Sequence, residues 1–214
     1  MEDFGMKLKQ LLKRDRRLFL AMALLLLIGI WFGEILPRLQ PAAAQQIEQM
    51  ALERFAEIAH RMKGASLFGQ IGLIWANNVS ASILAFCGGL FLPLIPAGLL
   101  VGNGLLIGVF QKYTEVHSGL TIAHFYLGLL PHGLFELPAY VIAIGLGVRF
   151  GLIPYRLILH YIRTKEHLPL FREFLNDLRY YAVLLLFLFT VAATVEVAVT
   201  PYLMQLFVRY PISI

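Results

Sequence analysis

The most unusual chemical feature of this sequence is an imidazole and a carboxylate inside an apolar stretch. His132 and Glu136 lie four residues apart within segment 131–136, Pro-His-Gly-Leu-Phe-Glu. Side chains at this spacing share one face of a helix, so the pair can ligate one divalent cation, such as zinc or iron, or share a hydrogen bond. An ionisable group at membrane depth costs about 3 kcal/mol or more unless it is paired, hydrated or ligated. The pair therefore marks a candidate functional site.

Three interpretations of this pair are open from the sequence. In the first, it binds a metal with His124 as a third ligand, which requires the preceding segment to fold back. In the second, Glu136 and the imidazoles form a structural polar network with buried asparagines. The third is a proton relay. The spacing is a weaker metal signature than His-Glu-x-x-His, which the sequence lacks.

Composition shows what surrounds the pair. Hydrophobic residues make up 59% of the 214 residues and charged residues 14%, against about 25% in a soluble domain. The mean hydropathy is +0.73. We therefore predict an all-α, polytopic membrane bundle of about five spanning helices, with residues 18–214 as one membrane-embedded domain. The single cysteine, Cys87, excludes an intrachain disulfide.

The first apolar run, Leu18–Leu36, follows a basic segment that we interpret as a cytoplasmic tail, residues 1–17. A cleaved signal peptide is the alternative. The run is longer than a signal-peptide core, and it ends at bulky residues and Pro37 rather than at small ones. These features favour a retained spanning helix.

Residues 41–64 carry apolar side chains at helical spacing among Gln, Glu, Arg and Lys. This pattern predicts an amphipathic helix outside the membrane that starts near Pro41, because proline suits a first helical turn. The helix either lies on the bilayer or bundle, or offers a docking face to an extracytoplasmic partner.

Two further spans are predicted, from Leu67 to Leu90 and from about Pro96 to Phe110. They contain Asn77, Asn78 and Asn103, whose amides need hydrogen-bond partners in hydrocarbon. These asparagines either bond across helices or line a polar cavity, and Glu196 in the last span is another buried candidate. Six glycines are expected to allow close helix contact. They are Gly88, Gly89, Gly98, Gly102, Gly104 and Gly108.

Residues 120–148 form an apolar stretch too long for an ordinary straight span across about 30 Å of hydrocarbon. We predict a break at Pro131, since proline lacks the amide donor and disfavours helix at the residue before it. A short re-entrant or interfacial segment near 120–130 would then precede a spanning helix, with a kink at Pro138.

Charge returns in residues 149–180, which predict amphipathic helices on an anionic lipid face rather than a nucleic-acid site. The last span is expected at Tyr181–Leu206. With five spans, the 1–17 tail and the 149–180 loop share a face and carry twelve of the eighteen Lys and Arg residues. The positive-inside rule then places the N-terminus in the cytoplasm and the C-terminus outside a bacterial inner membrane.

The order of these features resembles the stage II sporulation protein M family over essentially the whole chain. The residues that carry the likeness are Asn77-Asn78, Gly102-Asn103-Gly104 with Gly108, and the Pro-His-Gly-x-x-Glu element followed by Gly145 and Gly147. In spore formers, the resemblance implies an inner-membrane protein needed for forespore engulfment. Such a protein recruits and stabilises a peptidoglycan-degrading complex that contains stage II sporulation proteins D and P.

Two functions follow as hypotheses. The leading one is a non-enzymatic membrane scaffold, whose polar core maintains an outer docking surface. The alternative is a metal-dependent intramembrane enzyme or a transport component built on His132, Glu136 and the asparagines. The glycine-rich spans also favour self-association, for example as a homodimer.

Overall fold

The computed structural model describes residues 2–118, 121–165 and 169–203. Those residues form helices and no strand, which confirms the predicted all-α class. In chain order the helices are α1 (Glu2–Leu39), α2 (Pro41–Met62), α3 (Leu67–Gly88), α4 (Leu94–Ser118), α5 (Ile122–Thr164) and α6 (Leu170–Ala198).

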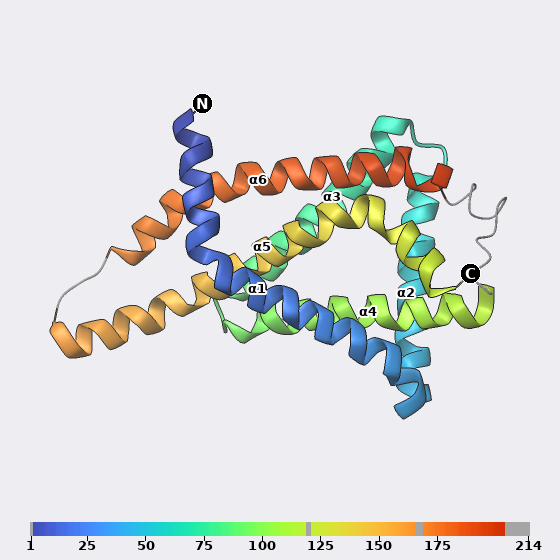
Figure 1. The fold of residues 1–214 in the computed structure, drawn as a ribbon, viewed down its shortest axis with the longest axis horizontal. Coiled ribbons are helices and arrows are strands. Elements are labelled where there is room, and N and C mark those ends of the chain that lie inside the picture. Colours follow the sequence, from blue (N-terminus) through green and yellow to red (C-terminus); the bar gives the residue numbers. More distant parts are fainter. Residues whose placement is uncertain (1, 119–120, 166–168, 204–214) are drawn as a thin grey trace.

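Five helices, all except α2, are long and apolar enough to cross a membrane, as predicted. Helix α2 is the amphipathic helix expected at 41–64, and it begins at Pro41. Figure 1 shows that α2 runs across the long helices near one end of the molecule. The end of α1 and the start of α3 lie at this same end because both adjoin α2 in the chain.

The predicted break at Pro131 is wrong. Helix α5 continues from Ile122 to Thr164 with Pro131, Pro138 and Pro154 inside it, so residues 122–130 are not a separate re-entrant segment. Figure 1 shows α5 bending in its yellow part instead. A proline removes one backbone hydrogen bond, and packed neighbouring helices in a membrane protein allow the helix to bend and continue.

Three polar segments of the sequence are parts of the long helices and not loops between them. The basic tail is the beginning of α1, and Lys112–Ser118 is the last part of α4. Residues 149–180 are divided between the end of α5 and the start of α6, which Pro169 caps. Leucine, arginine and lysine are good helix formers, so alternating charge and apolar residues does not end a helix.

Helices α1 and α4 touch through their backbones at four glycines. A Cβ added at Gly29 would collide with the carbonyl oxygen of Val101, and one at Gly33 with that of Leu105. The contact is reciprocal, since Gly104 and Gly108 press against the carbonyl oxygens of Leu26 and Ile30. Each helix thus contributes a small-xxx-small pair to the kind of close contact that holds membrane helices together.

The expected glycine contacts are therefore only partly present. Gly104 and Gly108 pack as predicted, and Gly89 lies against the backbone of α5 at Gly147 and Gly151. By contrast, an added Cβ at Gly98 or Gly102 would meet nothing within 4 Å. Gly104 and Gly108 lie on the side of α4 that meets α1 at close range, whereas no described residue comes that close to Gly98 or Gly102.

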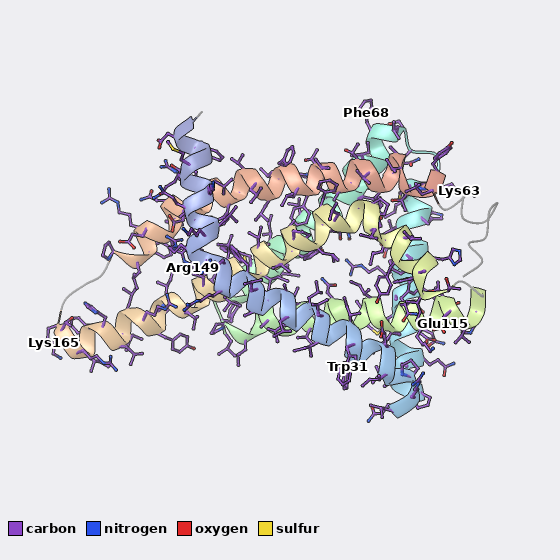
Figure 2. All side chains as sticks on the ribbon, in the orientation of Figure 1. Trp31, Lys63, Phe68, Glu115, Arg149 and Lys165 are labelled. Carbon is purple, nitrogen blue, oxygen red and sulfur yellow. The ribbon has the colours of Figure 1, made fainter. Side chains whose placement is uncertain are left out.

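A charged network joins α1, α5 and α6 at the end of the molecule opposite α2. Arg149 donates to Asp15 at 3.0 Å and to Asp177 at 2.8 Å, while Arg14 donates to Asp177 at 2.9 Å. The Tyr181 hydroxyl donates to Asp15 at 2.8 Å. Figure 2 shows Arg149 where α1 and α5 meet. Two arginines and two aspartates balance in charge, and the Arg14 side chain is partly exposed, so neither aspartate lacks a counter-ion.

We expect Gly104→Ala to destabilise the protein and Gly102→Ala to leave it nearly unchanged. The first substitution forces α1 away from α4 and should lower the free energy of unfolding by about 1–3 kcal/mol. The second places a methyl group in open space. Helix propensity alone would favour alanine at both positions. Equal effects in thermal unfolding of the detergent-solubilised protein would contradict the packing argument.

Asp177→Asn should lower the free energy of unfolding by about 1–3 kcal/mol, because it leaves Arg149 and the partly exposed Arg14 facing one carboxylate. Asp177 is 6% exposed. Glu173→Gln, on an exposed turn of the same helix, is the matched control and should change stability by less than about 0.5 kcal/mol. Chemical unfolding followed by helical circular dichroism measures both variants.

Candidate functional site

Three ionisable side chains converge between α5 and α6. Each of His132, Glu136 and Glu196 offers one ligand atom, and these atoms all lie within 4.8 Å of one another. All three residues are half-buried. His132 and Glu136 lie on one face of α5, one helical turn apart, as their spacing predicts. Glu196 reaches them from α6, near its C-terminal end.

His132 is positioned by a residue that follows α6. Its Nδ1 lies 3.2 Å from the hydroxyl oxygen of Thr200, and that hydroxyl also lies 3.5 Å from the carbonyl oxygen of Val195. When Nδ1 carries the ring proton and donates it to Thr200, Nε2 keeps its lone pair. The imidazole can then accept a proton or bind a cation through Nε2.

A row of amides continues the site toward α2. Arg54 of α2 donates to the side-chain oxygen of Asn77 at 3.2 Å, and Asn77 donates to that of Asn78 at 3.2 Å. Asn78 lies beside Glu136. Hydrogen bonds thereby join the polar groups of α2 and α3, and the row ends beside the half-buried Glu136 carboxylate of α5.

The predicted site residues fall into two groups. Asn77, Asn78 and Glu196 lie with the His132 and Glu136 pair, as the polar-cluster hypothesis requires. Asn103 lies on α4 and forms no hydrogen bond to them in the part of the chain that the structure describes. Its helix packs mainly against α1, whereas the three converging side chains lie on α5 and α6.

His124 does not join the three converging residues. It is buried in the first turn of α5, where its Nδ1 lies 2.6 Å from the hydroxyl oxygen of Thr121. His124 was predicted to approach His132 and Glu136 because a break at Pro131 would fold the preceding segment back. In a continuous helix, eight residues separate the two imidazoles by about 12 Å along the axis.

Arg54 and Thr200 carry no sequence motif that predicts a place in the site, and the pairing of Glu196 with Glu136 was not predicted either. The sequence nevertheless contained a signal for the pairing of Glu136 with Glu196. Helices α5 and α6 are joined by a short connection, which makes them antiparallel neighbours. Glu136 and Glu196 lie nearly the same number of residues from that connection, so they reach similar depth.

A family model described as stage II sporulation protein M matches residues 21–201. The chain belongs to this family. An uncharacterized protein of Methanocaldococcus jannaschii is 31% identical over 134 residues, which cover 60% of this chain and 69% of that relative. No solved structure matches the chain.

Membership in the stage II sporulation protein M family confirms the resemblance drawn from the sequence. The matched residues include the α1–α4 glycine contact, the amide row and all three converging side chains. The family and the five apolar helices together identify a membrane protein.

We expect Thr200→Val to lower the free energy of unfolding by about 1 kcal/mol, because the His132 ring loses the partner of its Nδ1 atom. Thr194→Val is the matched control: its hydroxyl donates only within α6, to the carbonyl of Thr190, and the residue is exposed. Thermal unfolding at neutral pH measures the difference. Identical melting temperatures would show that the Thr200 contact contributes nothing.

Proposed function

We propose that this member of the stage II sporulation protein M family is a multi-pass membrane scaffold that holds peptidoglycan-degrading enzymes at the outer face of the cell membrane. The observation that carries the proposal is helix α2, which is anchored to the spanning helices on one side and exposed on the other. The sporulation proteins D and P are the partners that the family implies.

Three kinds of contact anchor α2. Ala44 is buried in a small apolar cluster with Leu36 and Val109 of the spanning helices. The rings of Phe55 and Phe110 lie 5.0 Å apart. Further along, the hydrogen bond from Arg54 reaches α3. A helix fixed to three spanning helices presents its outer face in one orientation, which reduces the entropy lost when a partner binds.

The outer face of α2 combines apolar and charged side chains. Met50 is 69% exposed, although its apolar side chain would ordinarily be buried. Glu53, Glu57 and Arg61 are exposed near it. This face therefore offers a partner protein one apolar contact and several charged ones.

Charge distribution supports an extracytoplasmic position for α2. Figure 2 shows Lys63, next to α2, and Lys165, beyond α5, at opposite ends of the molecule. The basic start of α1 and the basic residues around the α5–α6 connection lie with Lys165. The positive-inside rule assigns that end to the cytoplasm, so α2 and the partner enzymes belong on the other side.

Binding of the partners is expected to depend on the α2 face. Met50→Lys, and separately Glu53→Lys with Glu57→Lys, should reduce the amount of partner recovered per chain by about tenfold, which corresponds to about 1.4 kcal/mol of binding free energy. The measurement is co-purification of the full chain with proteins D and P of its own organism from a detergent extract.

Glu173→Lys is the matched control, because it reverses an exposed acidic charge at the other end of the molecule. Its partner recovery should equal that of the unmodified chain. The proposal is wrong if the unmodified chain recovers neither partner, or if all α2 variants recover both at the full level while accumulating normally.

A further inference from the structure

We infer that His132, Glu136 and Glu196 bind one divalent transition-metal ion, which fastens α6 to α5 inside the membrane region. This site goes beyond the scaffold function and does not depend on the identity of any partner. The residues come from two helices and from distant parts of the sequence, so the site exists only in the folded chain.

The donor set suits such an ion. One imidazole nitrogen and two carboxylate oxygens are ligands that zinc and ferrous iron accept, whereas magnesium and calcium prefer oxygen alone. Ligand atoms within 4.8 Å of one another need only small side-chain movements to reach a common ion. Three protein ligands also leave a coordination position for water.

Charge provides an independent argument. Among the residues that the structure describes, no lysine or arginine forms an ion pair with Glu136 or Glu196. The charged network of Asp15 and Asp177, by contrast, is balanced by two arginines. Two carboxylates at membrane depth require either protons or a cation. The neighbouring imidazole favours a cation that both ligand types can bind.

Asn78 supplies a second observation. The residue is 5% exposed, and its Nδ2 atom is buried without a hydrogen-bond partner in the described structure. It lies beside Glu136. A Glu136 carboxylate that gives one oxygen to a metal offers the other to this amide, and bonds of this kind orient metal ligands. Thr200, bonded to His132, does the same for the imidazole.

The bend in α5 gives the site a structural role. His132 follows Pro131, where a backbone hydrogen bond is lost, and Glu196 lies two residues before α6 ends at Ala198. A metal joining these residues would fix the bent part of α5 to the end of α6. A bond from Asn78 to the metal-bound Glu136 would link this ordered region to Asn77, Arg54 and α2.

Metal content of the purified full-length chain tests the inference directly. After passage over a metal-free column, elemental analysis should find about one zinc or iron per chain. His132→Gln, Glu136→Gln and Glu196→Gln should each lower this content at least tenfold. Glu57→Gln and His60→Gln, at exposed positions of α2, are the matched controls and should keep the full content.

A second measurement needs no variant. Chelator-treated, unmodified protein should melt at a higher temperature as zinc is added, because an ion that binds only the folded state stabilises it in proportion to the logarithm of its concentration. Magnesium at the same concentrations should have no effect. Asn78→Leu should weaken zinc binding by about tenfold or more if its amide orients Glu136.

Several results would overturn the inference. The first is folded, monodisperse protein that contains no metal and does not respond to zinc or ferrous iron, which would indicate that the two carboxylates share protons. A response to magnesium equal to that of zinc would exclude a transition-metal site. Full metal content in all three ligand variants would place the metal elsewhere. None of these results bears on partner recovery through α2, so the scaffold proposal is tested separately.

Discussion

The direct contact between the backbones of α1 and α4 determines how the other helices can be arranged. In lipid, apolar side chains gain little by meeting one another, so helices associate where small residues allow many close backbone contacts. Gly29 and Gly33 on one helix, with Gly104 and Gly108 on the other, provide such a surface. Because α2 follows α1 directly and also packs on α4, this contact fixes the place of α2.

The polar groups follow a second constraint, which is that none can face lipid without a partner. The structure meets it differently at its two ends. At the end near Arg149, aspartates and arginines neutralise one another in a network across three helices. At the end near α2, amides form a row that leads to two carboxylates and an imidazole, with no basic side chain paired to those acids in the described residues. The second arrangement is the one for which we propose a bound cation.

These two constraints are the ones on which the proposed scaffold function depends. The spanning helices are held by glycine contacts and buried polar groups, which leaves α2 free of any role in crossing the membrane. Its inner side is fixed to the bundle through Ala44 and Arg54, while its outer side remains open to a partner. A cation between α5 and α6 would add order to the end of the bundle that supports α2.

The all-helical membrane class, the five apolar spans, the amphipathic α2 and the family could all be predicted from the sequence. These features depend on composition and on local periodicity, which each segment carries alone. The sequence also predicted that His132 and Glu136 share a face, because they lie one turn apart on one helix. It failed where the outcome depends on neighbours: Pro131 suggested a break, and packing allowed a bend. That Glu196 joins His132 and Glu136, and His124 does not, became clear from the folded structure, because residues on different helices meet through packing that no local spacing encodes.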